Sequence, residues 1–154
     1  MKARVLARAP VEILYELARD TEEFKKYAPA IKEIKVLQRS EDGNFVQVEW
    51  TAHANFFGAA RTLTWVQNDE WDNKNLVCRF CLCRSNDMKK LAGEWEFKTH
   101  PKGTEMIFSV NFQVHHPLMT PLIHRILDQI MRKNNEAMLN GLKKKAEQEF
   151  WTEW

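Results

Sequence analysis

The sequence predicts an α+β fold in which about seven antiparallel strands form a sheet that one long C-terminal helix covers. Two observations lead to this prediction. Residues 31–114 read as consecutive strand-like segments with alternating apolar and polar residues, joined by short turns. Residues 117–150 then read as one amphipathic helix, whose apolar stripe needs a sheet to pack against. The predicted order is one strand, two short helices, six strands and the long helix.

The N-terminal part supplies the first strand and both short helices. Residues 2–8 alternate like a strand, and Pro10 then opens a helix, because proline is favoured in the first helical turn. Asp20 or Thr21 caps a second short helix, which ends at Pro29. We expect these two helices to close one end of the sheet.

The middle of the chain is a meander of strands. Its clearest alternation lies in 45–56, where Val46, Val48 and Trp50 share one side and Gln47 and Glu49 take the other. Turn residues separate the segments, which favours antiparallel pairing of neighbours. The predicted strands are 31–39, 45–56, 60–67, 76–84, a segment that contains 91–97, and 104–114.

The long helix has two unusual residues on its apolar side. Asn134 and Gly141 interrupt the stripe, and a polar amide or a bare glycine on a core face costs stability unless something there requires it. The sequence therefore predicts a cavity between helix and sheet. Two interpretations of Asn134 stand side by side, a ligand contact and a bond to a strand or a buried water; Gly141 is interpreted as allowing close approach to the sheet. The stripe consists of Met119, Ile123, Ile126, Leu127, Ile130, Ala137, Met138 and Leu142.

Composition limits the function classes. The 154 residues fit one domain, 1–154, with 44% hydrophobic residues and a net charge of only +2. Basic residues are scattered, which argues against nucleic-acid binding, and no segment approaches a membrane span. A strand points the Cys78 side chain to one face and those of Cys81 and Cys83 to the other, so the three cannot converge on a metal ion. Neighbours in one strand also rarely meet disulfide geometry. We expect no disulfide, no metal site and no cofactor. The odd cysteine count indicates a reducing compartment, the cytoplasm.

Several short motifs occur together in one order along most of the chain. They are Ala9-Pro10 with Tyr15, Trp65, Leu91-x-Gly93-x-Trp95-x-Phe97, Gly103-Thr104-Glu105-Met106 and Arg132-x-Asn134. In this order and spacing the chain resembles the START-like helix-grip (SRPBCC) superfamily, and within it the polyketide cyclase/dehydrase, or aromatase/cyclase, group.

The resemblance implies a curved sheet that grips the C-terminal helix around a deep hydrophobic cavity. Members bind lipids, sterols, ubiquinone, plant hormones or polyketides, and tetracenomycin-type aromatase/cyclases fold a poly-β-ketone chain there for ring closure and dehydration. Positions similar to Trp65, Trp95 and Asn134 line that cavity. This chain departs from the group at four other positions. Gln67 and Asp69 stand in place of a serine and an arginine, Ile31 in place of a tyrosine, and Leu82 in place of a second arginine.

We therefore expect a cavity that binds a flat or polyketide-like hydrophobic molecule and promotes its cyclisation and dehydration without metal or covalent intermediate. Asn134 and Arg61 are the candidate catalytic residues, although Arg61 at a sheet edge would face solvent instead. The alternative is a non-catalytic lipid or quinone carrier.

The tryptophans either contact ligand or fill the core. Partners implied are the small molecule, an acyl-carrier protein for a polyketide enzyme, and a homodimer formed through the aromatic tail. The candidate ligand-binding residues are Phe24, Trp50, Leu63, Trp65, Gln67, Phe80, Leu82, Trp95, Phe108, Ile130 and Met138.

Overall fold

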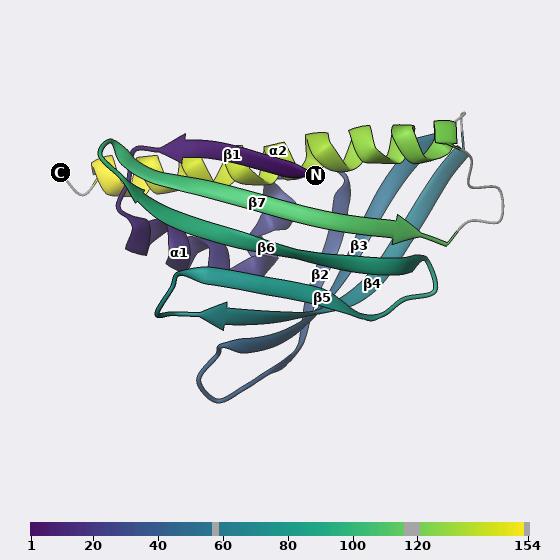
Figure 1. Ribbon diagram of the computed structural model, residues 1–154, viewed down its shortest axis with the longest axis horizontal. Helices are drawn as coiled ribbons and strands as arrows, with labels where there is room; N and C mark the ends of the chain where they lie inside the picture. Colours follow the sequence, from purple (N-terminus) through teal and green to yellow (C-terminus); the bar gives the residue numbers. More distant parts are fainter. Residues whose placement is uncertain (57–58, 116–120, 153–154) are drawn as a thin grey trace.

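A computed structural model describes residues 1–56, 59–115 and 121–152, and it shows a curved antiparallel sheet wrapped around one side of a long helix (Figure 1). This confirms the predicted fold class, including the seven strands. The strands are β1 (Lys2–Ala7), β2 (Ile31–Arg39), β3 (Phe45–Phe56), β4 (Ala59–Asp72), β5 (Val77–Arg84), β6 (Met88–His100) and β7 (Gly103–Val114).

The strands from β2 to β7 form a meander, and β1 adds to its far edge. The order across the sheet is β1-β7-β6-β5-β4-β3-β2, and every neighbouring pair is antiparallel. Alternation positions the core: Val46, Val48 and Trp50 of β3 are buried, while the residues between them remain partly accessible. The apolar residues that alternate along the sequence of β3 therefore lie on the concave side of the sheet, which faces the helix.

The helices cover this concave side. The long helix α2 (Pro121–Thr152) lies beside β1, and α1 (Val11–Arg19) packs against it near one end of the sheet (Figure 1). A short 3-10 helix, η1 (Thr21–Lys26), contacts β2. The predicted start of the long helix at Pro117, and Met119 of its stripe, lie outside the described residues. The buried residues of α2 are Leu127, Asn134, Asn135, Met138, Leu139, Leu142 and Ala146.

Arg19 at the end of α1 holds the helix to two loops at this end of the sheet. Its guanidinium donates to Asn73 Oδ1 at 2.8 Å, to Asn44 Oδ1 at 3.1 Å and to the Gly43 carbonyl at 3.0 Å. Tyr15 donates its hydroxyl to the same Asn73 oxygen at 2.7 Å. These bonds hold α1 to the loops that contain Gly43, Asn44 and Asn73 at this end of the sheet.

Gly141 allows a close approach, but its neighbour differs from the one expected. A Cβ built on Gly141 would lie 2.3 Å from Cγ of Tyr27, the residue that ends η1. The glycine therefore makes room for an aromatic ring from the short helix rather than for a strand of the sheet.

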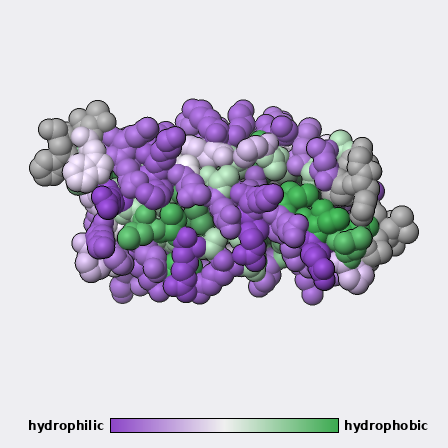
Figure 2. Space-filling model, turned by 90° about the horizontal axis from the view of Figure 1, so that it is seen from above, coloured by the Kyte–Doolittle hydropathy of each residue, from purple (hydrophilic) through white to green (hydrophobic). Residues whose placement is uncertain are grey.

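The face of the molecule that is seen from above is mostly hydrophilic. In the view from above, polar side chains cover most of the surface, and hydrophobic residues gather in two areas, one toward the amino-terminal end of α2 (Figure 2). Among the described residues, no helix combines the length and apolar character needed to cross a bilayer.

Candidate functional site

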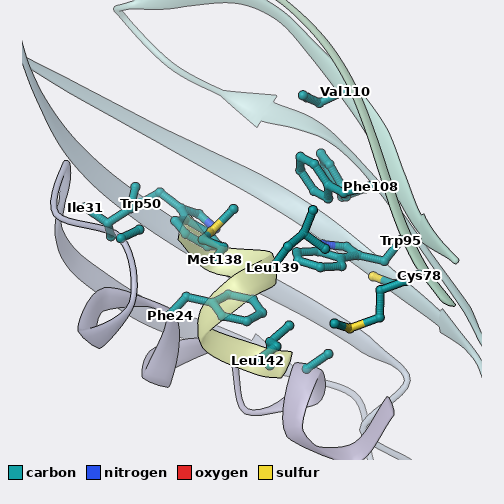
Figure 3. Packing of buried hydrophobic residues seen from close by; sticks show 14 of the residues in the cluster. Phe24, Ile31, Trp50, Cys78, Trp95, Phe108, Val110, Met138, Leu139 and Leu142 are labelled. Carbon is teal, nitrogen blue, oxygen red and sulfur yellow. The ribbon is translucent and has the colours of Figure 1, made fainter. Parts of the chain in front are cut away.

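A partly open cavity lies between α2 and the concave face of the sheet. Its volume is about 40 Å³, which is room for about three water molecules. In the close-up, Met138 and Leu139 point from α2 toward Trp50, Trp95 and Phe108 of the sheet (Figure 3). The lining residues are Ile31, Trp50, Trp65, Gln67, Phe80, Leu91, Trp95, Phe108, Val110, Met131, Asn134, Asn135 and Met138.

Five of the thirteen lining residues are aromatic, and several of their rings stack on one another or on neighbouring rings. The indoles of Trp50 and Trp65 are nearly parallel, with ring centroids 6.0 Å apart and an interplanar angle of 3°. Phe24 of η1 stacks on Trp50 and on Trp95, at 6.2 Å and 5.6 Å, and Trp95 contacts Phe108 at 4.6 Å. Such rings supply flat apolar surface with few internal degrees of freedom, so the wall suits a flat ligand.

Two polar atoms of this wall have no hydrogen-bond partner among the described residues. They are Asn134 Oδ1, on α2, and Trp50 Nε1, on β3, and both are buried. An unsatisfied buried donor or acceptor costs about 1–3 kcal/mol. One acceptor and one donor are thus left unsatisfied in a mostly apolar cavity that the Gln67 and Asn135 side chains also line.

A chain of hydrogen bonds runs along β4 behind the cavity. Trp65 Nε1 donates to Gln67 Oε1 at 2.9 Å, and Gln67 Nε2 donates to Asp69 Oδ1 at 2.8 Å. All three side chains are buried, Asp69 with only 4% of its surface exposed. Burial raises the pKa of the Asp69 carboxyl from 3.8 to about 7, because the bond from Gln67 offsets only part of the lost hydration.

A second amide on α2, Asn135, also lines the cavity. Its Nδ2 lies 3.3 Å from the Met1 sulfur, and a thioether is only a weak acceptor. Asn134 and Asn135 therefore bring two adjacent amides to the cover of an apolar cavity.

A family model described as "Polyketide cyclase / dehydrase and lipid transport" matches residues 8–139. The chain belongs to this family. The match spans α1, all strands from β2 to β7 and most of α2, so it includes every residue that lines the cavity.

Solved structures of family-like proteins share the fold. The protein TTHA0849 from Thermus thermophilus is 27% identical with a TM-score of 0.83, and the match covers 95% of each chain. The Zhui aromatase/cyclase from Streptomyces sp. R1128 is 18% identical with a TM-score of 0.80, covering 96% of this chain and 93% of that one. A START superfamily protein from Mycobacterium smegmatis is 17% identical with a TM-score of 0.74, covering 96% and 97%. A search of curated proteins found no match.

Most of the site residues that were predicted from the sequence lie together around the cavity. Asn134 lines the cavity together with seven of the predicted ligand-binding residues, and their roles toward a ligand stay predictions. The seven are Trp50, Trp65, Gln67, Phe80, Trp95, Phe108 and Met138.

Five predicted residues lie outside the lining. Phe24 stands behind Trp50 and Trp95, and Leu63 is buried in the core. Ile130 is half-buried, and Leu82 lines a separate open groove. Arg61 is exposed near the start of β4, so its predicted catalytic role has no contact in the cavity to support it.

Five lining residues were not among the predicted ligand-binding residues, and neither was the buried Asp69 behind Gln67, although Ile31 and Asp69 are two of the departures from the family pattern. Ile31, Leu91, Val110, Met131 and Asn135 also face the cavity. Leu91 and Val110 share the parity of predicted wall residues, so alternation could have found them. The burial of Asp69 was not predicted because the predicted strand ended at 67, whereas β4 continues to Asp72 and places Asp69 on the inward side.

Proposed function

We propose that this protein binds a flat, hydrophobic small molecule in the cavity beneath α2. The observation that supports this most directly is the wall of stacked rings that holds two buried, unpaired polar atoms, Asn134 Oδ1 and Trp50 Nε1. A cavity filled only for stability would avoid such atoms, because each costs free energy. Membership of a family of cyclases and lipid transporters supports the same function.

A ligand with one or more rings needs more room than the cavity has in this conformation. Met131 and Met138 contribute flexible, unbranched side chains from α2 to the lining. Methionine side chains repack readily around different shapes. We therefore expect the ligand to enter by displacing these two side chains rather than the indoles of the sheet.

The test uses N-phenyl-1-naphthylamine, an uncharged flat probe whose fluorescence rises in apolar surroundings. We expect saturable binding of one probe per chain, and tighter binding by Met138→Ala, which enlarges the cavity. The matched control is Leu142→Ala, since Leu142 is buried on the same helix but does not line the cavity. Both substitutions should destabilise the fold by about 2–5 kcal/mol. An equal change of probe affinity in both variants would contradict the proposal.

Cyclisation and dehydration of a polyketide chain is the second candidate function. The fold shared with the Zhui aromatase/cyclase supports it. Aldol closure forms one carbon–carbon bond and the following dehydration releases water, and Asn134 or a bound water would polarise the carbonyl while the cavity holds the chain in a reactive fold. An acyl-carrier protein would then be the partner that delivers the chain.

Binding without catalysis is favoured by the lining itself. No lysine, arginine, histidine or carboxylate stands among the described residues that line the cavity, and general acid–base catalysis needs such a group within hydrogen-bond reach. A synthetic poly-β-ketone thioester separates the candidates. Ring formation that Asn134→Leu abolishes would establish the enzyme, whereas probe binding without conversion would leave a lipid or quinone carrier. The odd cysteine count supports the cytoplasm as its location.

A further inference from the structure

The cavity carries a pattern of donors and acceptors that restricts the chemistry of its ligand. We propose that Asp69, acting through Gln67, makes the cavity selective for ligands whose polar group is an uncharged hydrogen-bond donor such as a hydroxyl, and excludes ligands that carry a carboxylate. This inference rests on the proposed binding function and adds the class of ligand and a positioning residue.

The first step is the orientation of the Gln67 amide, which both of its neighbours fix. An indole N–H can only donate, so the atom of Gln67 that faces Trp65 Nε1 at 2.9 Å must be the oxygen. Asp69 Oδ1 accepts at 2.8 Å from the amide nitrogen on the other side. Asp69 thus supplies the buried acceptor that keeps the amide nitrogen of Gln67 on this side.

The second step is what this orientation leaves for a ligand. Gln67 lines the cavity, and its carbonyl oxygen keeps a second lone pair beyond the bond from Trp65. Asn134 Oδ1 adds an acceptor without any partner, and Trp50 Nε1 is the one free buried donor among the described lining residues. A hydroxyl group can donate to an amide oxygen and also accept from the indole N–H.

The third step is the exclusion of anions. A carboxylate that enters the cavity loses its hydration, and no described lining residue carries a positive charge to replace it. It would face amide oxygens, and the buried Asp69 carboxyl stands directly behind Gln67. Repulsion from an ionised Asp69 adds to the desolvation cost. Two separate effects therefore weaken the binding of an acidic ligand.

The test compares three ligands of one shape, naphthalene, 2-naphthol and 2-naphthoate, by displacement of bound N-phenyl-1-naphthylamine at pH 8. We expect 2-naphthol to bind about 5- to 30-fold more tightly than naphthalene, the worth of one or two buried hydrogen bonds. We expect 2-naphthoate to bind more weakly than naphthalene. Removing the acceptor in Asn134→Leu, or the indole N–H in Trp50→Phe, should reduce the ratio of the 2-naphthol and naphthalene affinities, whatever happens to the affinity for naphthalene itself.

The role of Asp69 is tested by the ratio of the 2-naphthol and naphthalene affinities of each variant. A general loss of stability weakens the binding of both ligands and leaves this ratio unchanged. Asp69→Leu should lower this ratio, because Gln67 Nε2 loses its acceptor and only the bond from Trp65 then holds the amide. Asp69→Asn keeps an acceptor oxygen and should restore the ratio, while binding 2-naphthoate less poorly. Glu70→Gln is the matched control, since Glu70 is the next residue of β4 and is exposed.

Each outcome bears on one of the two proposals. Equal or tighter binding of 2-naphthoate than of 2-naphthol overturns the inference, and so does an unchanged affinity ratio in Asp69→Leu. Displacement of the probe by naphthalene and 2-naphthol with equal strength overturns it while the binding function stands. Failure of N-phenyl-1-naphthylamine to bind at all refutes the binding function and with it the inference.

Discussion

The buried carboxyl of Asp69 makes the stability of the fold depend on pH in a direction opposite to that of most acidic residues. Its pKa is raised by burial from 3.8 to about 7, so between these values the folded state holds a proton that the unfolded state releases. Stability is therefore greatest below pH 3.8 with respect to this group, and it falls as pH rises toward 7. Replacement by asparagine, Asp69→Asn, removes the charge and keeps an acceptor for Gln67.

The size of the effect follows from the shift of the pKa. A rise from 3.8 to about 7 corresponds to about 4 kcal/mol, at about 1.4 kcal/mol for each pH unit. Linkage gives a cost of about 2 kcal/mol at pH 5 and the full cost of about 4 kcal/mol at pH 8. The stabilisation of Asp69→Asn over the wild type should therefore grow by about 2–3 kcal/mol between pH 5 and pH 8.

Urea denaturation followed by tryptophan fluorescence measures this difference at the two pH values. Glu70→Gln is the control, because its exposed side chain on the other face of β4 should give little change at either pH. The reasoning is refuted if Asp69→Asn shifts the free energy of unfolding equally at pH 5 and pH 8. A destabilised variant at pH 8 would also refute it, since the ionised carboxyl would then be better accommodated than the amide.

Two further predictions concern packing and accessibility. Gly141→Ala should destabilise the fold by about 1–3 kcal/mol, because its Cβ would lie 2.3 Å from the Tyr27 ring, whereas Asn140→Ala, at an exposed position of α2, should not lower the urea midpoint. A thiol reagent should modify two cysteines of the native protein quickly and the third only in denaturant. Cys78 is buried and burial raises the pKa of its thiol, so three fast thiols would contradict this account.

Most of the fold could be predicted from the sequence because its strands are half-buried. Alternation in β3 separates a core side from an accessible side, and short turns restrict neighbours to antiparallel pairs. The end of β4 was not predicted, because Gln67 and Asp69 put polar residues on the inward side and break the pattern there. Periodicity cannot recognise a buried carboxyl whose only partner is another side chain.

The cavity was predictable in part, for a related reason. Parity gives the side of the sheet on which a residue lies, but not whether it touches a void, a neighbour or solvent. Trp65 and Arg61 share a parity on β4, yet Trp65 lines the cavity and Arg61 is exposed. On α2, Asn134 was found because an amide in an apolar stripe is conspicuous, whereas Met131 and Asn135 lie beside the stripe and have no such signal.

The pairing of β1 with β7 also governs how this domain folds. Lys2 of β1 pairs with Ser109 of β7. This edge of the sheet therefore forms only when the first strand of the chain meets the last one. Forming such a long loop costs chain entropy before any contact repays it, which slows folding. The rings that line the cavity belong mostly to β3–β7, and α2 follows them in the chain. During synthesis these aromatic rings are therefore complete before their cover exists, and α2 must reach them quickly to prevent association with other chains.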